Sequence, residues 1–145
     1  MNLICIGDSL TFGYCVHLSQ RWTRLCAQET GWELVNEGIN GDTTGGMLAR
    51  MQGGVLAELR EGGLGADRPY VLLMGGSNDV FYSGSDAAAR GNMGAMIHQL
   101  FSVGVLPMVG IPLPADAPHV PRAWAAAVDF EAAERTMKEY CAWLK

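Results

Sequence analysis

Four short apolar runs alternate along the chain with longer segments whose apolar residues recur at helical spacing. The runs predict strands at residues 3–6, 34–36, 70–74 and 105–111. Strands separated by helices pair in parallel, because a parallel connection needs a crossover that a helix usually supplies. A parallel sheet is buried on both faces, so its strands are apolar throughout. The pattern therefore predicts an α/β fold with helices on both faces of a parallel sheet.

Two helical regions are expected between the first three strands. The first begins at about Ser19 and ends at Gly31, since glycine after the last turn is a common helix stop. The second is capped by Thr44 and carries apolar residues as far as Leu59. Glycine pairs inside this second region weaken it by up to about 1 kcal/mol per glycine, which predicts a helix broken in two.

The second half of the chain predicts two more helices and an irregular segment. A turn-rich stretch at 62–67 leads into the third strand, and the helix that follows this strand ends at Gly104. Its methionines at helical spacing are expected in the core rather than on a lipid-binding surface. The proline-rich segment 112–121 cannot form regular structure and is expected to overhang the edge of the sheet. Asp129 caps the last helix.

Length and charge limit the classes of function. A chain of 145 residues with 49% hydrophobic content suffices for one domain, 1–145, with one core. A net charge of −5 with scattered Lys and Arg excludes a basic stripe for nucleic acid. No apolar run approaches the ~20 residues of a membrane helix. The first strand begins at Asn2 without a charged leader, which predicts a cytoplasmic location for the sequence as given.

The four cysteines predict neither a metal site nor a disulfide framework. Cys5, Cys15, Cys26 and Cys141 lack Cys-x-x-Cys spacing and lie in separate elements. We expect four reduced thiols, with Cys5 a small buried apolar residue of the first strand.

The residues Gly7-Asp8-Ser9-Leu10 follow the first predicted strand directly. Open α/β sheets place reactive groups in the crevice beyond the carboxyl ends of their strands. Gly7 permits a tight exit from the strand, and Ser9 stands near the start of the next helix, where it is a candidate nucleophile. Asp-Ser pairs also begin helices as ordinary caps, so this tetrapeptide alone does not identify a site.

Two further segments repeat the arrangement of a strand followed by glycine and small polar residues. The second strand precedes Asn40-Gly41-Asp42-Thr43, and the third precedes Gly75-Gly76-Ser77-Asn78-Asp79. With Gly7-Asp8-Ser9-Leu10, these segments resemble the three blocks of the SGNH hydrolases, also called the GDSL esterase/lipase family, and look closest to its thioesterase/lysophospholipase branch. Leu113-Pro114-Ala115 also has the look of that branch.

The resemblance implies a fold and a mechanism. The fold is a three-layer α/β/α sandwich with a flavodoxin-like parallel sheet. Ser9 is then the nucleophile, and its own N–H, the N–H of Gly41 and the side-chain amide of Asn78 form the oxyanion hole. Glycine lets the backbone approach the substrate, and an amide donor keeps its function at any working pH. The activity implied requires no cofactor and no metal.

Three aspartates lie beside these candidate catalytic residues. Asp8, Asp42 and Asp79 are expected to hold the loops in place, because acids in Asx turns and helix caps are common. Thr43 and Thr44 are expected to be caps for the same reason.

The expected base is the component that departs from the family pattern. The family carries it as an Asp-x-x-His block near the C-terminus, and no such block follows the helix that Asp129 caps. His119, with Asp116 close enough to orient it, is the best internal substitute; His17 and His98 are weaker ones. We expect the chain to be a fragment or nicked, without the last strand and helix of the fold. The missing block would then be lost or held as a C-terminal peptide carrying Asp-x-x-His.

The leading hypothesis is a serine hydrolase of carboxylic esters or thioesters that acts through an acyl-enzyme on Ser9. Related branches remove acetyl groups from sugars, so a carbohydrate O-acetyl esterase is an alternative. A different class is a non-catalytic small-ligand-binding module, or an inactive fragment, with an incomplete triad. A phosphate or nucleotide site is a weaker possibility, because no Gly-x-Gly-x-x-Gly or Gly-x4-Gly-Lys run is present. The residues expected to line an acyl pocket are Leu10, Phe12, Tyr14, Val80, Phe81, Tyr82 and Leu113.

Overall fold

A computed structural model describes residues 1–61 and 70–145 of the chain. The turn predicted at 62–67 lies outside the described residues. Four parallel strands form one sheet in the order β2-β1-β3-β4: β1 (Asn2–Gly7), β2 (Glu33–Gly38), β3 (Tyr70–Met74) and β4 (Pro107–Val109). Parallel pairing of all four confirms the predicted fold class.

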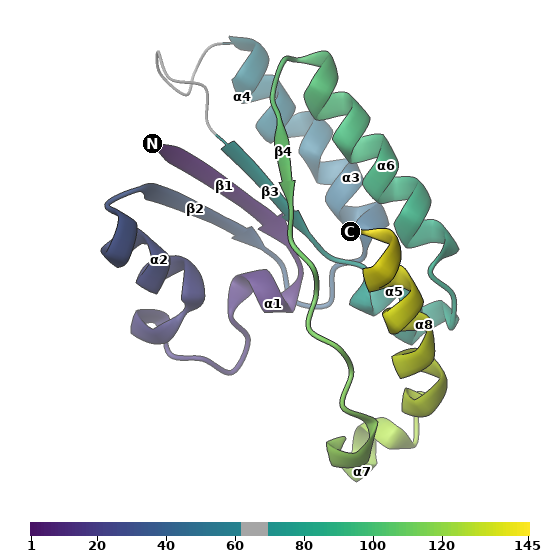
Figure 1. The fold of residues 1–145 in the computed structure, drawn as a ribbon. Helices are drawn as coiled ribbons and strands as arrows, with labels where there is room; N and C mark the ends of the chain where they lie inside the picture. Colours follow the sequence, from purple (N-terminus) through teal and green to yellow (C-terminus); the bar gives the residue numbers. More distant parts are fainter. Residues whose placement is uncertain (62–69) are drawn as a thin grey trace.

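Helices cover both faces of this sheet (Figure 1). One face carries α1 (Ser9–Phe12), η1 (Leu18–Gln20) and α2 (Trp22–Thr30), near β1 and β2. The opposite face carries α3 (Thr44–Gly53), α4 (Val55–Glu61) and α6 (Ala87–Ser102). The short α5 (Ser77–Ser83) follows β3, and η2 (Ala117–His119), α7 (Arg122–Ala125) and α8 (Phe130–Trp143) complete the chain. The layers are those of a three-layer α/β sandwich.

Most of the core lies between the sheet and α3, α4 and α6, and buried residues of α5 and α8 extend it. Alternate residues of β1 and β3 point towards these helices, as the two-residue period of a strand requires. The methionines of the helices meet them there, and Met47, Met51, Met93, Met96 and Met137 are all at most 1% exposed. The prediction that the methionines of α6, Met93 and Met96, belong to the core is confirmed.

Several predicted element bounds differ from the structure. The first long helix begins at Trp22, after a separate turn at η1, and ends at Gly31 in the left-handed region as predicted. The second region is broken at Gly54 as predicted, and Thr43 is its cap as expected, since its hydroxyl accepts from the Gly46 N–H. Thr44, also expected to be a cap, is instead the first residue of α3 and is buried.

The fourth strand is shorter than the predicted 105–111. The strand covers only residues 107–109, followed by one bond from the Gly110 N–H to the Leu73 carbonyl. It begins late because Val105 still donates its N–H to Leu100 at the end of α6. The proline-rich segment is less irregular than expected, since it contains the turns of η2 and α7. Proline fits the start of such a turn because its missing N–H has no partner there anyway. Asp129 caps α8 as predicted, with its carboxylate accepting from the Ala132 N–H.

Candidate active site

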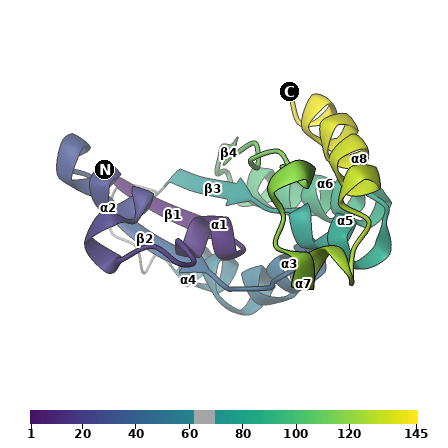
Figure 2. The same cartoon turned by 90° about the horizontal axis from the view of Figure 1, so that it is seen from below.

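Ser9 is the first residue of α1, which lies just beyond the carboxyl end of β1 (Figure 2). Asp8 caps the short helix α1, and its Oδ1 accepts from the Leu10 N–H at 2.9 Å. A Cβ on Gly7 would meet the Thr11 hydroxyl and the Met74 carbonyl, so only glycine allows the chain to leave β1 so close to β3. Ser9 itself is half-buried. The strand exit and the cap together present Ser9 at the edge of the sheet.

Gly41 lies in the loop between β2 and α3. Its φ of +77° is in the left-handed region, where a side chain would be strained. Gly38 begins this loop, and a Cβ there would meet the backbone of Phe12 in α1. The loop carrying Gly41 is therefore packed against the helix that begins at Ser9.

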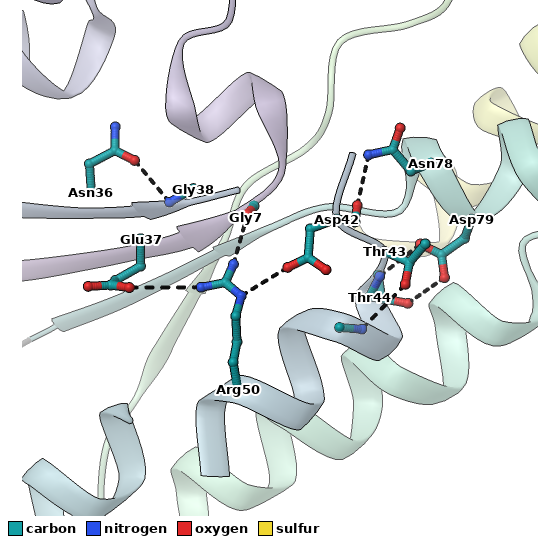
Figure 3. Close-up of polar contacts among 11 residues, drawn as sticks. Gly7, Asn36, Glu37, Gly38, Asp42, Thr43, Thr44, Arg50, Asn78 and Asp79 are labelled. Atoms are coloured by element: carbon teal, nitrogen blue, oxygen red, sulfur yellow. Dashed lines mark hydrogen bonds and ion pairs between the residues drawn. The ribbon is translucent and has the colours of Figure 1, made fainter. Parts of the chain in front are cut away.

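Asn78 lies in the first turn of α5, just beyond β3. Its side-chain amide nitrogen donates to the Asp42 carbonyl at 2.7 Å, which joins this turn to the loop of Gly41 (Figure 3). The turn exists because Gly76 has a φ of +115°, and a Cβ there would meet the ring of Tyr140 in α8. The Tyr140 hydroxyl donates to the Gly75 carbonyl at 3.0 Å. An amide has two hydrogens, so one remains for another acceptor.

The structure gives each of the three aspartates partners within these loops. The Asp79 carboxylate accepts from the Thr44 N–H at 2.9 Å and from the Thr44 hydroxyl at 2.7 Å. Asp42 accepts from Arg50 Nε at 2.9 Å. Asp8 is 1% exposed and its Oδ2 has no hydrogen-bond partner in the described part of the chain. Burial, and more weakly the charges of Asp42 and Asp79, raise the pKa of Asp8.

Two cavities meet at Ser9. The first has a volume of about 550 Å³ and contains Ser9, Gly41 and Asn78 in its lining. The second, of about 560 Å³, contains Asp8, Ser9 and Asn78. The side chains that line both cavities are Tyr14, Phe81 and Trp124, besides Ser9 and Asn78. The three residues expected to act on a substrate therefore border one space of the size that small-molecule sites have.

The predicted acyl-pocket residues divide into two groups. Tyr14, Phe81, Tyr82, Leu10 and Leu113 line one or both cavities. Val80 is 1% exposed and belongs to the core. Phe12 is not in either lining and lies under the Arg21 guanidinium, 4.1 Å from its ring centre.

The three histidines of the chain lie outside the linings of the two cavities of Ser9. His119 Nδ1 is 2.9 Å from the Asp116 carboxylate, but the two side chains are 81% and 69% exposed. His17 bonds Ser19 at 2.8 Å and lines a different cavity, against α2 and β2, and His98 is exposed. Among the described residues, none of the three lines a cavity that Ser9 lines.

The Asp-x-x-His spacing does occur once, at Asp116 and His119, although not after the last helix. The pair lies in η2 and its cap, ahead of α8. Sequence reasoning selected it as an internal substitute for the family block, and the structure shows the two side chains paired with each other at the surface.

Sequence reasoning missed two residues of this region. Trp124 lines both cavities from α7, and a tryptophan beside the proline-rich segment expected to overhang the site was the available signal. Arg50 contacts the loops of Ser9 and Gly41 from the last turn of α3. No local pattern marks Arg50, because its partners are distant in the sequence.

The described residues contain no group of three or more His, Cys, Asp or Glu placed to hold a metal. Within the same residues, no helix is both long and apolar enough to cross a bilayer. Cys5 is buried, which raises the pKa of its thiol to about 12. All four cysteines are free, as expected.

The structure is an α/β sandwich in which a serine, a glycine and an asparagine lie beyond the carboxyl ends of three neighbouring parallel strands. The chain belongs to the GDSL-like lipase/acylhydrolase family, whose model matches residues 5–145. This match confirms the family that the three sequence blocks indicated. No curated protein sequence matches the chain.

Solved structures share the fold. A G-D-S-L family protein from Desulfitobacterium hafniense DCB-2 is 24% identical with a TM-score of 0.75, over 98% of this chain and 68% of that one. The native aryl esterase of M. smegmatis is 20% identical with a TM-score of 0.78, over 99% and 76%. Est24, a carbohydrate acetylesterase from Sinorhizobium meliloti, is 20% identical with a TM-score of 0.76, also over 99% and 76%.

Proposed function

We propose that this chain is a serine hydrolase that cleaves carboxylic esters or thioesters through an acyl-enzyme on Ser9. The observation that carries the proposal is that Ser9, Gly41 and Asn78 line one cavity of about 550 Å³. Membership of the GDSL-like lipase/acylhydrolase family supports ester bonds as the target. Esterases among the structures with this fold agree with it.

In the proposed reaction, the Ser9 hydroxyl oxygen attacks the carbonyl carbon of the substrate. The Ser9 proton passes to a base and then to the leaving alcohol or thiol, as the bond to the carbonyl carbon breaks. Water then attacks the carbonyl carbon of the acyl-enzyme and gives a proton to the base. The base passes this proton to the Ser9 oxygen as its bond to the acyl group breaks and the carboxylic acid leaves. The negative oxygen formed in each step is stabilised by the N–H groups of Ser9 and Gly41 and by the Asn78 amide.

The bond from Asn78 to the Asp42 carbonyl supports this role. It fixes which way the amide points, and leaves the second amide hydrogen for the oxyanion. A donor that is already oriented pays no reorganisation cost in the transition state. The loss of one such donor costs about 2.7–4 kcal/mol of transition-state stabilisation.

The shape of the site favours a substrate with two sizeable apolar arms. Ser9 lies where two cavities of similar volume meet, so the acyl group and the leaving group can each occupy one. Aromatic side chains dominate the cavity of Gly41, where Tyr82 and Phe130 join the three shared ones. An acetyl group would leave most of either cavity empty. We therefore place the carbohydrate O-acetyl esterase second.

The base is proposed to come from an Asp-His pair outside residues 1–145. Within residues 1–61 and 70–145, which hold all three histidines, none borders the cavities of Ser9, and the His119 side chain is 81% exposed. A peptide that carries Asp-x-x-His could supply the pair in trans. The same observation favours the second class of function, a module that binds an apolar ester or acid without cleaving it.

Fluorophosphonate labelling of the purified chain, alone and with an added peptide that carries Asp-x-x-His, tests the proposal. A serine activated by a base and an oxyanion hole should be phosphonylated, and the label should disappear in Ser9→Ala. Asn78→Ala should slow labelling about 10²–10³-fold, the usual effect of one lost donor. Ser83→Ala is the matched control, because Ser83 ends α5 and its hydroxyl bonds backbone carbonyls. A chain that binds a long-chain fatty acid but is not labelled, with or without added peptide, would be a binding module instead.

A further inference from the structure

Arg50 joins the loops that carry the candidate catalytic residues, although it lies on α3 and touches neither cavity of Ser9. Its Nη2 donates to the Gly7 carbonyl at 2.9 Å, and its Nε donates to Asp42 Oδ2 at 2.9 Å. Figure 3 shows the guanidinium between these two groups, with Glu37 beyond it. We infer that Arg50 is a positioning residue that fixes the oxyanion hole, an inference that rests on the proposed function.

The first half of the argument concerns Asp42. Arg50 holds its carboxylate while Asn78 holds its carbonyl at 2.7 Å. Asp42 directly follows Gly41, so a displacement of Asp42 would move the Gly41 backbone and release the Asn78 amide together. Two of the three proposed oxyanion donors thus depend on the place of one residue.

The second half concerns the nucleophile. The Gly7 carbonyl that Arg50 binds is two residues before Ser9, at the last position of β1. The same carbonyl accepts from the Ile39 N–H at 3.0 Å, in the loop of Gly41. Arg50 therefore fixes the separation between the Ser9 loop and the Gly41 loop, which sets the distance from the nucleophile to its donors.

Arginine suits this position better than lysine. Its planar guanidinium presents donors in fixed directions, so one side chain binds the carbonyl and the carboxylate at the same time. Lysine carries one compact ammonium group and cannot reproduce that fork. The Arg50 side chain is 23% exposed and that of Asp42 is 13% exposed, so water competes only partly with the pair.

Gly46 reserves the space that the Asp42 carboxylate occupies. A Cβ at Gly46 would fall on Asp42 Oδ1. Gly46→Ala would therefore displace the carboxylate from Arg50 without changing Arg50 itself. Since alanine is also the better helix former, this variant separates displacement of Asp42 from loss of the helix.

The test measures geometry and rate separately. We would record the Gly41 backbone amide and the Asn78 side-chain amide by NMR, the latter assigned by its loss in Asn78→Asp. Both signals should shift in Arg50→Lys and in Gly46→Ala. Arg90→Lys is the matched control, because Arg90 pairs with Asp86 on α6 at 2.6 Å and lies outside both cavities. Unmoved signals in Arg50→Lys would overturn the inference.

The rate measurement uses fluorophosphonate labelling. Arg50→Lys and Gly46→Ala should slow labelling about 10–100-fold, less than the loss of a donor, while inhibitor affinity changes little. In Arg50→Ala, added guanidinium should restore part of the rate, since a cavity of about 120 Å³ already borders Arg50. Rates in both variants equal to that of Arg90→Lys would also overturn the inference. If the amide signals shift but the wild-type chain is never labelled, the positioning holds and the proposed hydrolase function fails.

Discussion

The loops that follow β1, β2 and β3 are held differently from the segment that follows β4. In the first three, polar side chains bond across the fold: Asn78 to Asp42, Asp79 to Thr44 and Arg50 to Gly7, over 36, 35 and 43 residues of sequence. In residues 113–127, the hydrogen bonds shown join residues at most four apart. The tertiary structure therefore fixes the arrangement of Ser9, Gly41 and Asn78, whereas local turns fix that of Asp116 and His119.

The difference also appears in burial. Asp79 and Thr44 are 7% and 0% exposed, while most residues of the later segment are exposed. A hydrogen bond between buried groups is costly to lose, because a partner left alone cannot turn to water. Substitutions in the three loops should therefore lower the stability of the protein strongly. In the native chain these loops should keep a fixed geometry. The later segment should tolerate substitution, apart from the residues that line the cavities.

The largest effect is expected from Asp79→Ala. This change removes two charge-assisted hydrogen bonds and leaves the Thr44 N–H and hydroxyl without their buried acceptor. We expect a loss of about 3 kcal/mol in the free energy of unfolding, measured by urea denaturation. Asp116→Ala, which breaks the exposed pair with His119 in the later segment, should cost about 1 kcal/mol or less. Equal losses in the two variants would break the comparison between buried and exposed contacts.

For the first region, the sequence predicted which residues meet but did not predict the contacts that hold them. Glycines and small polar residues after three strands predicted which residues meet, because the carboxyl ends of parallel strands share one edge. The three aspartates were assigned to the loops for a local reason, Asx turns and caps, but only Asp8 caps a helix. Asp42 and Asp79 act through Arg50 and Thr44, and no local pattern indicates such distant partners.

The region after β4 was predicted less well. Its prolines indicated an irregular segment, but proline also fits the first turn of a helix, and η2 and α7 form there. The predicted strand at 105–111 was too long, because β-branched and apolar residues continue past the three that pair. The position of Trp124 over both cavities depends on the path of this segment, which propensity does not determine.

A smaller effect on the free energy of unfolding is expected from Asp8→Asn. This variant tests whether the folded state disfavours the charged form of the Asp8 carboxyl group in the first region. Burial raises the pKa of Asp8, so the native state binds this proton more tightly than the unfolded state. The contribution of Asp8 to stability is therefore full at acid pH and is lost as pH rises through its native pKa. Asp8→Asn keeps an oxygen acceptor for the Leu10 N–H and removes this dependence. The unfolding free energy of the variant minus that of the wild type should rise between pH 4 and 7. A constant difference would show that Asp8 ionises in the folded state as easily as in the unfolded one.

The smallest effect is expected from His119→Ala, in the second region. Its pair with Asp116 is exposed and local, and such pairs contribute about 0–1 kcal/mol, so urea denaturation should detect little change. Because neither residue borders the cavities of Ser9, the rate of fluorophosphonate labelling should also stay within about twofold of wild type, a change of about 0.4 kcal/mol. A loss of labelling in His119→Ala at unchanged stability would instead make the Asp116-His119 pair the base. The segment after β4 would then have to bring His119 from the surface to Ser9, and the geometry of the reaction would no longer be fixed by the three interlocked loops alone.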